Sequence, residues 1–434
     1  MSKTSIKALL LAMLCAPCAA LGGETVTLSH LYDLAEQQSV SMQVYKTGIE
    51  SAGKEIEIAK NNYLPDITGE LSIGYLGDGV LSDRKFNNWM HVDNPHYMNN
   101  IALKAQQVLY AGGAIRSGVD LAQLGEQMAQ LDYEKNRQEI RFMIASCYLD
   151  LCRLQNRRQV VEKNIELTAK IIDNITSKYD HGTALKTDIT RYELQMEQLR
   201  LQLTKIDDAC AVTSSRLAIM LHMPASTMLE ADFASVSADN RTLSLEQWQE
   251  LSEGNNNLRQ ANLATDINSQ KLRLEKSERL PKVAAFAALQ FDGPITVEVP
   301  VLNKNICYWY AGIGISYNFS SLYKNNKNMA KAKINLAQSQ LQRDAAREQV
   351  TTAVKAAYTD YLTSYKELDT QRKSVALADE NYAVVSNRYD NGLALLTDML
   401  DASNSKLTAD LGAVDAEINI IYNYFKLKYI CHSL

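Results

Sequence analysis

The chain has few of the residues that interrupt helices, because its 434 residues include only 7 prolines and 19 glycines. Residues 96–223 and 301–434 contain no proline at all. An interior proline removes a backbone hydrogen bond and kinks a helix, so two such stretches permit very long helices. The low glycine and proline content also argues against a disordered, low-complexity chain.

An excess of positive charge is missing as well. The formal net charge is −5 and no basic cluster stands out, which argues against a general nucleic-acid-binding protein. Beyond residue 23 the sequence contains no nucleophile–base arrangement, no phosphate-binding loop and no Cys-x-x-Cys motif. We therefore expect neither an enzymatic activity nor a bound cofactor or metal.

A long apolar run is absent, and the short one at residues 8–14 cannot span a membrane as a helix. Lys3 and Lys7 precede this run, and small residues follow it. This is the pattern of an export signal, which we predict over residues 1–23, with cleavage near its end. Cys15 and Cys18 leave a lipid-modified N-terminus open, although Leu14 and Pro17 are poor matches to the small residue that such processing prefers.

Cysteine is scarce in the expected mature chain. Five cysteines remain after residue 23: Cys147, Cys152, Cys210, Cys307 and Cys431. An odd number leaves at least one thiol unpaired, so the chain is not a disulfide scaffold. We interpret these residues as small buried side chains.

What the sequence does contain is an internal duplication. Residues 178–188 return as residues 388–398, and Tyr, Asp, Gly, Ala, Leu, Thr and Asp recur in place. A second pair agrees, because Leu64-Pro65 corresponds to Leu280-Pro281. The chain must therefore be read as two equivalent parts.

Each part is expected to form one long helical hairpin, at about 113–222 and about 321–430. Apolar residues in both stretches fall on the three–four spacing that marks a seam between packed helices. The first helix, from about residue 115, would be about 65 residues long. Gly182 and Gly392 are expected to end the long helices, because glycine adopts the left-handed conformation after the last turn without steric cost.

Four shorter segments alternate between apolar and polar residues. The expected strands are about 66–76, 99–110, 282–291 and 308–319. Strands of about ten residues with one apolar face are typical of membrane β-barrels, although a soluble β-hairpin in each part remains an alternative. Four strands cannot close a barrel, and an open edge in lipid leaves backbone groups unsatisfied. If the strands span a membrane, several copies must share one barrel.

These observations divide the chain into four parts. The expected divisions are a signal peptide at 1–23, a first repeat at 24–223, a linker at 224–257 and a second repeat at 258–434.

With these features, the sequence resembles the TolC-type outer-membrane efflux proteins over about residues 25–432. The motifs that carry the resemblance are Leu64-Pro65, the segment Gln107-Val108-Leu109-Tyr110-Ala111-Gly112-Gly113, and residues 388–393 followed by 397–402. The resemblance implies a fold that is mostly α with β, a tandem-duplicated protomer of an oligomeric channel. Its long helical hairpins would form an α-barrel across the periplasm, and its four strands would join a shared 12-stranded transmembrane β-barrel.

The resemblance also implies partners. It implies a homotrimer in outer-membrane lipid that serves as the exit duct of an efflux pump without a catalytic role. About residues 224–257 and the C-terminal end would form a belt around the α-barrel. The duct would meet a periplasmic adaptor protein and an inner-membrane pump of the RND or ABC type. The cargo stays open between drug efflux, metal efflux and type I protein secretion. An exported coiled-coil scaffold or adhesin is an alternative of a different class.

The helix-ending turns, here called the tips, are the expected adaptor-docking surface. The residues concerned are Tyr179, Asp180, Gly182, Tyr389, Asp390 and Gly392. A purely structural role as helix stops is the alternative, since glycine there has a sufficient local reason.

Two further sites follow from the resemblance. Asp398 and Asp401 lie a turn apart on one helix face and match the family's paired aspartates at the periplasmic mouth; a ring of carboxylates there would select cations. The plain alternative is two solvated surface aspartates. Thr187, Asp188 and Tyr389 match residues that latch the closed channel. The family's latch arginine is replaced by Ala394, so a looser closure is expected.

Overall fold

A computed structural model describes residues 24–236, 243–298 and 301–434. The expected signal peptide lies outside these residues. The chain divides into two compact units. Of the described residues, unit 1 contains 24–43, 136–236, 243–252 and 351–434, and unit 2 contains 44–135, 253–298 and 301–350. Each unit thus takes residues from both of the expected repeats.

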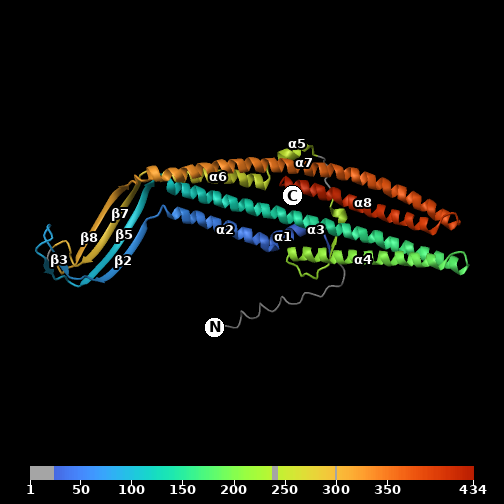
Figure 1. The fold of residues 1–434 in the computed structure, drawn as a ribbon, viewed down its shortest axis with the longest axis horizontal. Coiled ribbons are helices and arrows are strands. Elements are labelled where there is room, and N and C mark those ends of the chain that lie inside the picture. Colours follow the sequence, from blue (N-terminus) through green and yellow to red (C-terminus); the bar gives the residue numbers. More distant parts are fainter. Residues whose placement is uncertain (1–23, 237–242, 299–300) are drawn as a thin grey trace, which may run out of the picture. The chain divides into compact units, whose positions relative to one another are not determined.

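Unit 2 contains a four-stranded sheet that is ordered β2-β5-β7-β8 (Figure 1). Its strands are β2 (Asp66–Tyr75), β5 (Tyr97–Ala111), β7 (Lys282–Gly293) and β8 (Ile306–Ser316). All neighbouring strands are antiparallel. The central β5–β7 pair joins the expected first repeat to the second. Within the described residues, β2 and β8 each keep one edge without a partner strand.

The register places apolar side chains on one face of this sheet. Leu103 pairs with Leu289, and Leu289 pairs with Trp309, so these three side chains share a face. Leu71 and Trp309 are 70% and 76% exposed there. On the opposite face, Lys104 of β5 forms an ion pair with Glu70 of β2 at 2.7 Å. The sheet therefore exposes an apolar face, which is unfavourable in water.

One strand ends earlier than the sequence predicts. β8 ends at Ser316 instead of continuing to residue 319. The Asn318 side chain accepts a hydrogen bond from the backbone N–H of Ser320 at 3.1 Å, which forms a turn before the next helix. The segment between β2 and β5 contains a small hairpin of β3 (Gly79–Leu81) and β4 (Met90–Val92).

The helices include two of unusual length. α3 (Ala114–Asp180) has 67 residues and α7 (Ser321–Asp390) has 70. At 1.5 Å per residue each is about 100 Å long. The other helices are α1 (Leu28–Gln38), α2 (Val40–Asn61), α4 (Lys186–Met220), α5 (Leu245–Ser252), α6 (Asn256–Ser277) and α8 (Leu396–Ile430). Among the described residues, no helix combines the length and apolar character needed to cross a membrane.

Polar contacts join the helices of unit 2 at two levels along α6. Arg259 of α6 bonds to Glu134 of α3. Asn325 of α7 donates a hydrogen bond of 2.7 Å to the backbone oxygen of Glu275 in α6. The long helices are therefore tied to the short α6 by bonds as well as by packing.

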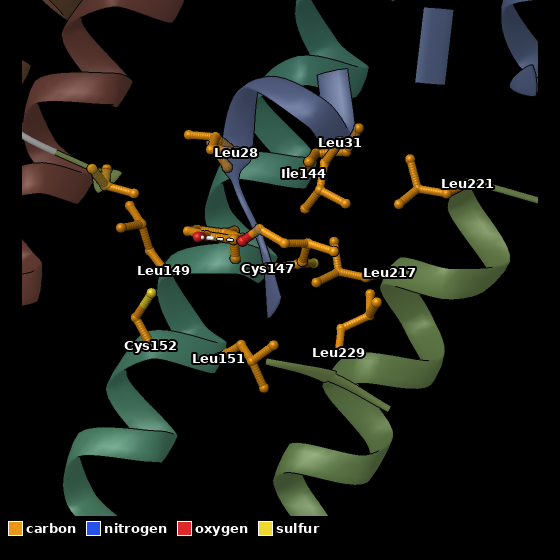
Figure 2. Close-up of a cluster of buried hydrophobic side chains, with 14 of the residues drawn as sticks. Leu28, Leu31, Ile144, Cys147, Leu149, Leu151, Cys152, Leu217, Leu221 and Leu229 are labelled. Carbon is orange, nitrogen blue, oxygen red and sulfur yellow. Dashed lines mark hydrogen bonds between the residues drawn. The ribbon is translucent and has the colours of Figure 1, made fainter. Parts of the chain in front are cut away.

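The core of unit 1 forms where α1, α3 and α4 meet two short strands (Figure 2). Leu31, Ile144 and Leu217 are fully buried in it. The Tyr148 hydroxyl donates to the Val26 carbonyl at 2.8 Å and accepts from the Asp232 N–H at 2.8 Å. These bonds hold β1 (Glu24–Val26), which is parallel to β6 (Leu229–Ala231), against α3. Among the described residues of the range 224–257, the structure contains β6, the short helix η1 (Phe233–Ser235), α5 and the start of α6.

Candidate functional site: the paired helical tips

The two tips have the same backbone geometry. Gly182 has φ of +71° and Gly392 has φ of +72°. At the first tip, the N–H of Gly182 bonds to the oxygen of Tyr179 at 2.9 Å, and the N–H of Thr183 bonds to the oxygen of Lys178 at 2.9 Å. The second tip repeats both bonds at positions 210 residues later, at 3.0 Å and 2.7 Å. This is the Schellman ending of a helix, which explains why glycine stands at both positions.

The helices that leave the tips begin alike. The Asp188 carboxylate accepts a hydrogen bond from the N–H of Leu185 at 3.1 Å. Asp398 does the same for Leu395 at 3.0 Å. Each aspartate is the third residue of its helix, where a carboxylate satisfies a free N–H and opposes the helix dipole. Asp188 and Asp398 therefore stabilise the starts of α4 and α8.

Direct contacts join one tip to the other. The Lys178 ammonium lies 3.3 Å from the Asp390 carboxylate and 4.4 Å from the centre of the Tyr389 ring. Asn174 also donates to Asp390 at 3.3 Å. Lys178 of the first hairpin is thus held by the Asp390 carboxylate and the Tyr389 ring of the second.

An apolar cluster lies behind these contacts. It consists of buried Ile175, Tyr192, Leu396 and Met399, with partly buried residues such as Tyr389 packed against it. Burial raises the pKa of Tyr389, and the nearby carboxylates of Asp188 and Asp390 raise this pKa further. Tyr389 is therefore a neutral phenol that contributes packing and an aromatic face.

A groove of about 620 Å³ opens between the tips. Residues of both hairpins line it, including Lys178, Asp188, Arg191, Tyr389 and Asp390. Ala394, in the position expected to hold an arginine, is also part of its lining. The groove carries both charge signs, since Lys178 and Arg191 face the same space as two carboxylates.

The structure brings most of the expected tip residues together. Asp188, Tyr389, Asp390 and Gly392 share the groove. Tyr179, Asp180, Gly182 and Thr187 are exposed on the same turns, with the Gly182 N–H bonded to Tyr179 as described. Asp401 is exposed one turn beyond Asp398 on α8.

The sequence reasoning missed several residues of this surface. It gave no role to Lys178, although Lys178 stands in the duplicated motif where the second copy has Arg388. It also overlooked three leucines, Leu185, Leu393 and Leu395, which are 68–70% exposed at the tips. Exposed leucine beside a duplicated turn is a signal that a search for charged residues does not detect.

Comparisons with known proteins agree with this architecture. The family model described as outer membrane efflux protein matches residues 31–221 and 248–427. The outer membrane efflux protein BepC of Brucella suis biovar 1 (strain 1330) is 18% identical over 405 residues, which cover 92% of this chain and 84% of BepC. The outer membrane protein TolC of Salmonella enteritidis is 18% identical over 416 residues, which cover 94% of this chain and 82% of TolC.

A solved structure gives the same result for the fold. The outer membrane protein VceC of Vibrio cholerae is 17% identical to this chain and superposes with a TM-score of 0.77, covering 93% of this chain and 96% of VceC. The fold class inferred from the motifs, a TolC-type arrangement of long helical hairpins and strands, is confirmed. None of these relatives is described as an enzyme, which supports a non-enzymatic role. The chain belongs to the outer membrane efflux protein family and is located in the outer membrane, extending into the periplasm.

Proposed function

We propose that three copies of this chain form the outer-membrane exit duct of a tripartite efflux pump. The observation that carries the proposal is the sheet of unit 2, which has two edges unpaired within the described part of the chain and an exposed apolar face. In lipid, an unpaired strand edge leaves several N–H and C=O groups without partners. Pairing β2 of one copy with β8 of the next removes both edges, and three sheets of four strands then form a 12-stranded barrel.

The remaining parts of the chain follow from this arrangement. Residues 1–23 serve as the export signal, and the repeats 24–223 and 258–434 are joined by the linker 224–257. The helical hairpins form the periplasmic α-barrel. Family membership favours this account over a coiled-coil scaffold or adhesin, whereas type I protein secretion remains the alternative use of the same duct.

Native mass spectrometry in mild detergent tests the trimer. The full-length protein is expected to appear as a trimer that survives release from the micelle. A population made only of monomers, with helical content intact, would refute the shared barrel.

The tips are proposed to bind a periplasmic adaptor protein, through which the duct meets an inner-membrane pump of the RND or ABC type. The support is their exposure and their composition. Leu185, Leu393 and Leu395 offer apolar contact area, and the groove between them offers both charge signs. A second helical tip, with leucines and charges of its own, is the kind of partner that such a surface fits.

Replacing Gly182 and Gly392 together by valine tests this docking role. A β-branched residue at a positive φ is strained, but a Cβ at either position meets no atom within 4 Å. The change should therefore deform the tips and leave the rest of the chain intact. Efflux is expected to be lost while trimer yield is unchanged. Normal efflux in the double variant would rule out docking through these turns.

The proposed mouth of the duct lies beside the tips. Asp398 and Asp401 would contribute six carboxylates in three copies, and such a ring favours cations. Thr187, Asp188 and Tyr389 are proposed to hold the closed state against a neighbouring copy. The contact of Lys178 with Asp390 and Tyr389 occurs within one copy, and we propose that it takes part of the role left vacant by Ala394.

A further inference from the structure

An aromatic cluster lies on the polar face of the sheet in unit 2. Phe286 of β7 and Tyr310 of β8 meet edge to face, with ring centres 6.1 Å apart. Tyr308 stacks on Tyr310 at 6.3 Å. Alternation along β8 places both tyrosines opposite to Trp309, which belongs to the apolar face. These rings are therefore on the side of the sheet that would face the lumen of the barrel.

Two glycines make room for this cluster. Gly312 and Gly314 lie under the Phe286 ring, and a Cβ at Gly312 would come within 2.9 Å of the ring carbon Cζ. Phe286 and Tyr310 nevertheless remain 39% and 42% exposed. One side of the cluster thus rests on the strand backbone, and the other side is open.

A carboxylate stands at the end of the cluster. Asp292 accepts hydrogen bonds from the Asn100 amide and from the Tyr308 hydroxyl. None of the ion pairs formed by the described part of the chain includes Asp292. Lys104, on the same face, is paired with Glu70. The rings and the carboxylate together form a surface that we call the ledge: Phe286, Tyr308, Tyr310 and Asp292.

We propose that the ledge binds lipophilic organic cations that carry aromatic groups, as they pass through the lumen. The faces of aromatic rings attract cations, and the Asp292 carboxylate, which is hydrogen-bonded but has no ion-pair partner among the described residues, adds a fixed negative charge. The open rings also stack with flat apolar groups. A lipophilic cation makes all of these contacts at once, whereas an anion meets repulsion from Asp292 and a small hydrated cation gains little from the rings.

The proposal rests on the proposed function, because the polar face becomes a lumen only in the shared barrel. A purely structural reading exists as well, since aromatic rings commonly cover glycines in curved sheets. The two hypotheses differ in whether the rings of the ledge bind a passing cation, and channel recordings distinguish between them.

The experiment records single channels of the full-length protein in planar bilayers, with tetraphenylphosphonium added on the side of the β7–β8 loop. The wild type is expected to show brief current interruptions that depend on the tetraphenylphosphonium concentration. Tyr310→Leu should raise the half-blocking concentration about tenfold, because one cation–ring contact is lost. Tyr310→Phe keeps the ring and should retain the block. Asp292→Asn should weaken the block and its voltage dependence.

A matched control stands on the same strand. Trp309→Leu removes a neighbouring aromatic ring from the opposite face and should leave the block unchanged. Equal block in the wild type and in Tyr310→Leu would overturn the ledge, and so would equal losses in Tyr310→Leu and Trp309→Leu. Channels that conduct normally but are never blocked would refute the ledge alone, whereas a wild type that forms no channels would refute the proposed function together with it.

Discussion

At the scale of single residues, Asp188 and Asp398 show how one position can carry two roles. Both aspartates bond to the N–H of the leucine that precedes their helix, so each has a local structural reason to be present. A part in the pore mouth is additional for Asp398. Asp401, one turn further, has no comparable bond to a helix start, so the two aspartates can be separated by experiment.

Asp398→Ala is expected to lower the stability of the folded protein by about 0.5–1 kcal/mol, the usual size of a helix-capping contribution. Asp401→Ala should leave stability nearly unchanged. Both substitutions should weaken block by multivalent cations added from the periplasmic side, if both carboxylates line the mouth. Thermal unfolding and bilayer recording measure the two effects. Equal stability losses would show that the cap of α8 is unimportant, and unchanged block in both variants would remove these residues from the pore.

Glu36 provides a pH-dependent contribution to stability. Burial alone would raise its pKa, but hydrogen bonds and charges of Arg137 and Arg141 outweigh burial and hold the pKa below its ordinary 4.5. A lowered pKa in the folded state means that the stabilisation is complete above the unfolded pKa and is lost as the pH falls through the folded value. Glu36→Gln should therefore melt at a lower temperature than the wild type at pH 7.

The difference in melting temperature between the wild type and Glu36→Gln should shrink as the pH falls below about 4. Melting curves recorded between pH 3 and pH 8 provide the measurement. A difference that stays constant over this range would mean that the charge of Glu36 does not stabilise the fold.

At the scale of helices and strands, the two tips are joined by Lys178. Lys178→Met keeps the aliphatic side chain and removes its charge, so the contacts with Asp390 and the Tyr389 ring are lost. An ion pair and a cation–ring contact at a half-exposed site are each worth about 0.5–1 kcal/mol. Hydrogen exchange at residues 174–190 and 385–398 should become about five- to thirtyfold faster. Lys186→Met, which removes an exposed lysine from the same tip, is the control; equal rates in both variants would contradict the bridge.

Long helices could be predicted from the sequence because their signals are local. The absence of proline, the three–four apolar spacing and the terminal glycines are all visible in α3 and α7. The end of β8 could not be predicted in the same way, because Tyr317 and Phe319 continue the alternation and only the turn at Asn318 interrupts it.

Contacts between segments that are distant in the sequence could not be predicted from local sequence patterns either. The motif identified Tyr389, Asp390 and Asp398 as tip residues, but it did not indicate that Lys178 lies against the first two. That contact joins positions 212 residues apart, and no periodicity along one helix reports on it. The ledge was missed for a related reason, since alternation in β8 drew attention to its apolar face and not to the tyrosines between.

At the scale of the whole molecule, the two faces of the sheet must meet different surroundings. Leu71→Arg places a charge on the apolar face of β2 and should cost about 2–4 kcal/mol near the middle of the bilayer, with a strong loss of trimer. Ser72→Arg places the same charge one residue along the same strand, on the polar face, where a charge is tolerated. Trimer yield in detergent is the measurement. Equal yields from the two variants would mean that the sheet does not face lipid in the proposed way.

The duct itself is tested most directly by single-channel recording of the purified full-length wild type in a planar bilayer. The account predicts discrete current steps of uniform size that favour cations over anions and arise from protein that is trimeric by native mass spectrometry. Folded protein that yields no current steps at any concentration, or that conducts only as monomers, would contradict it.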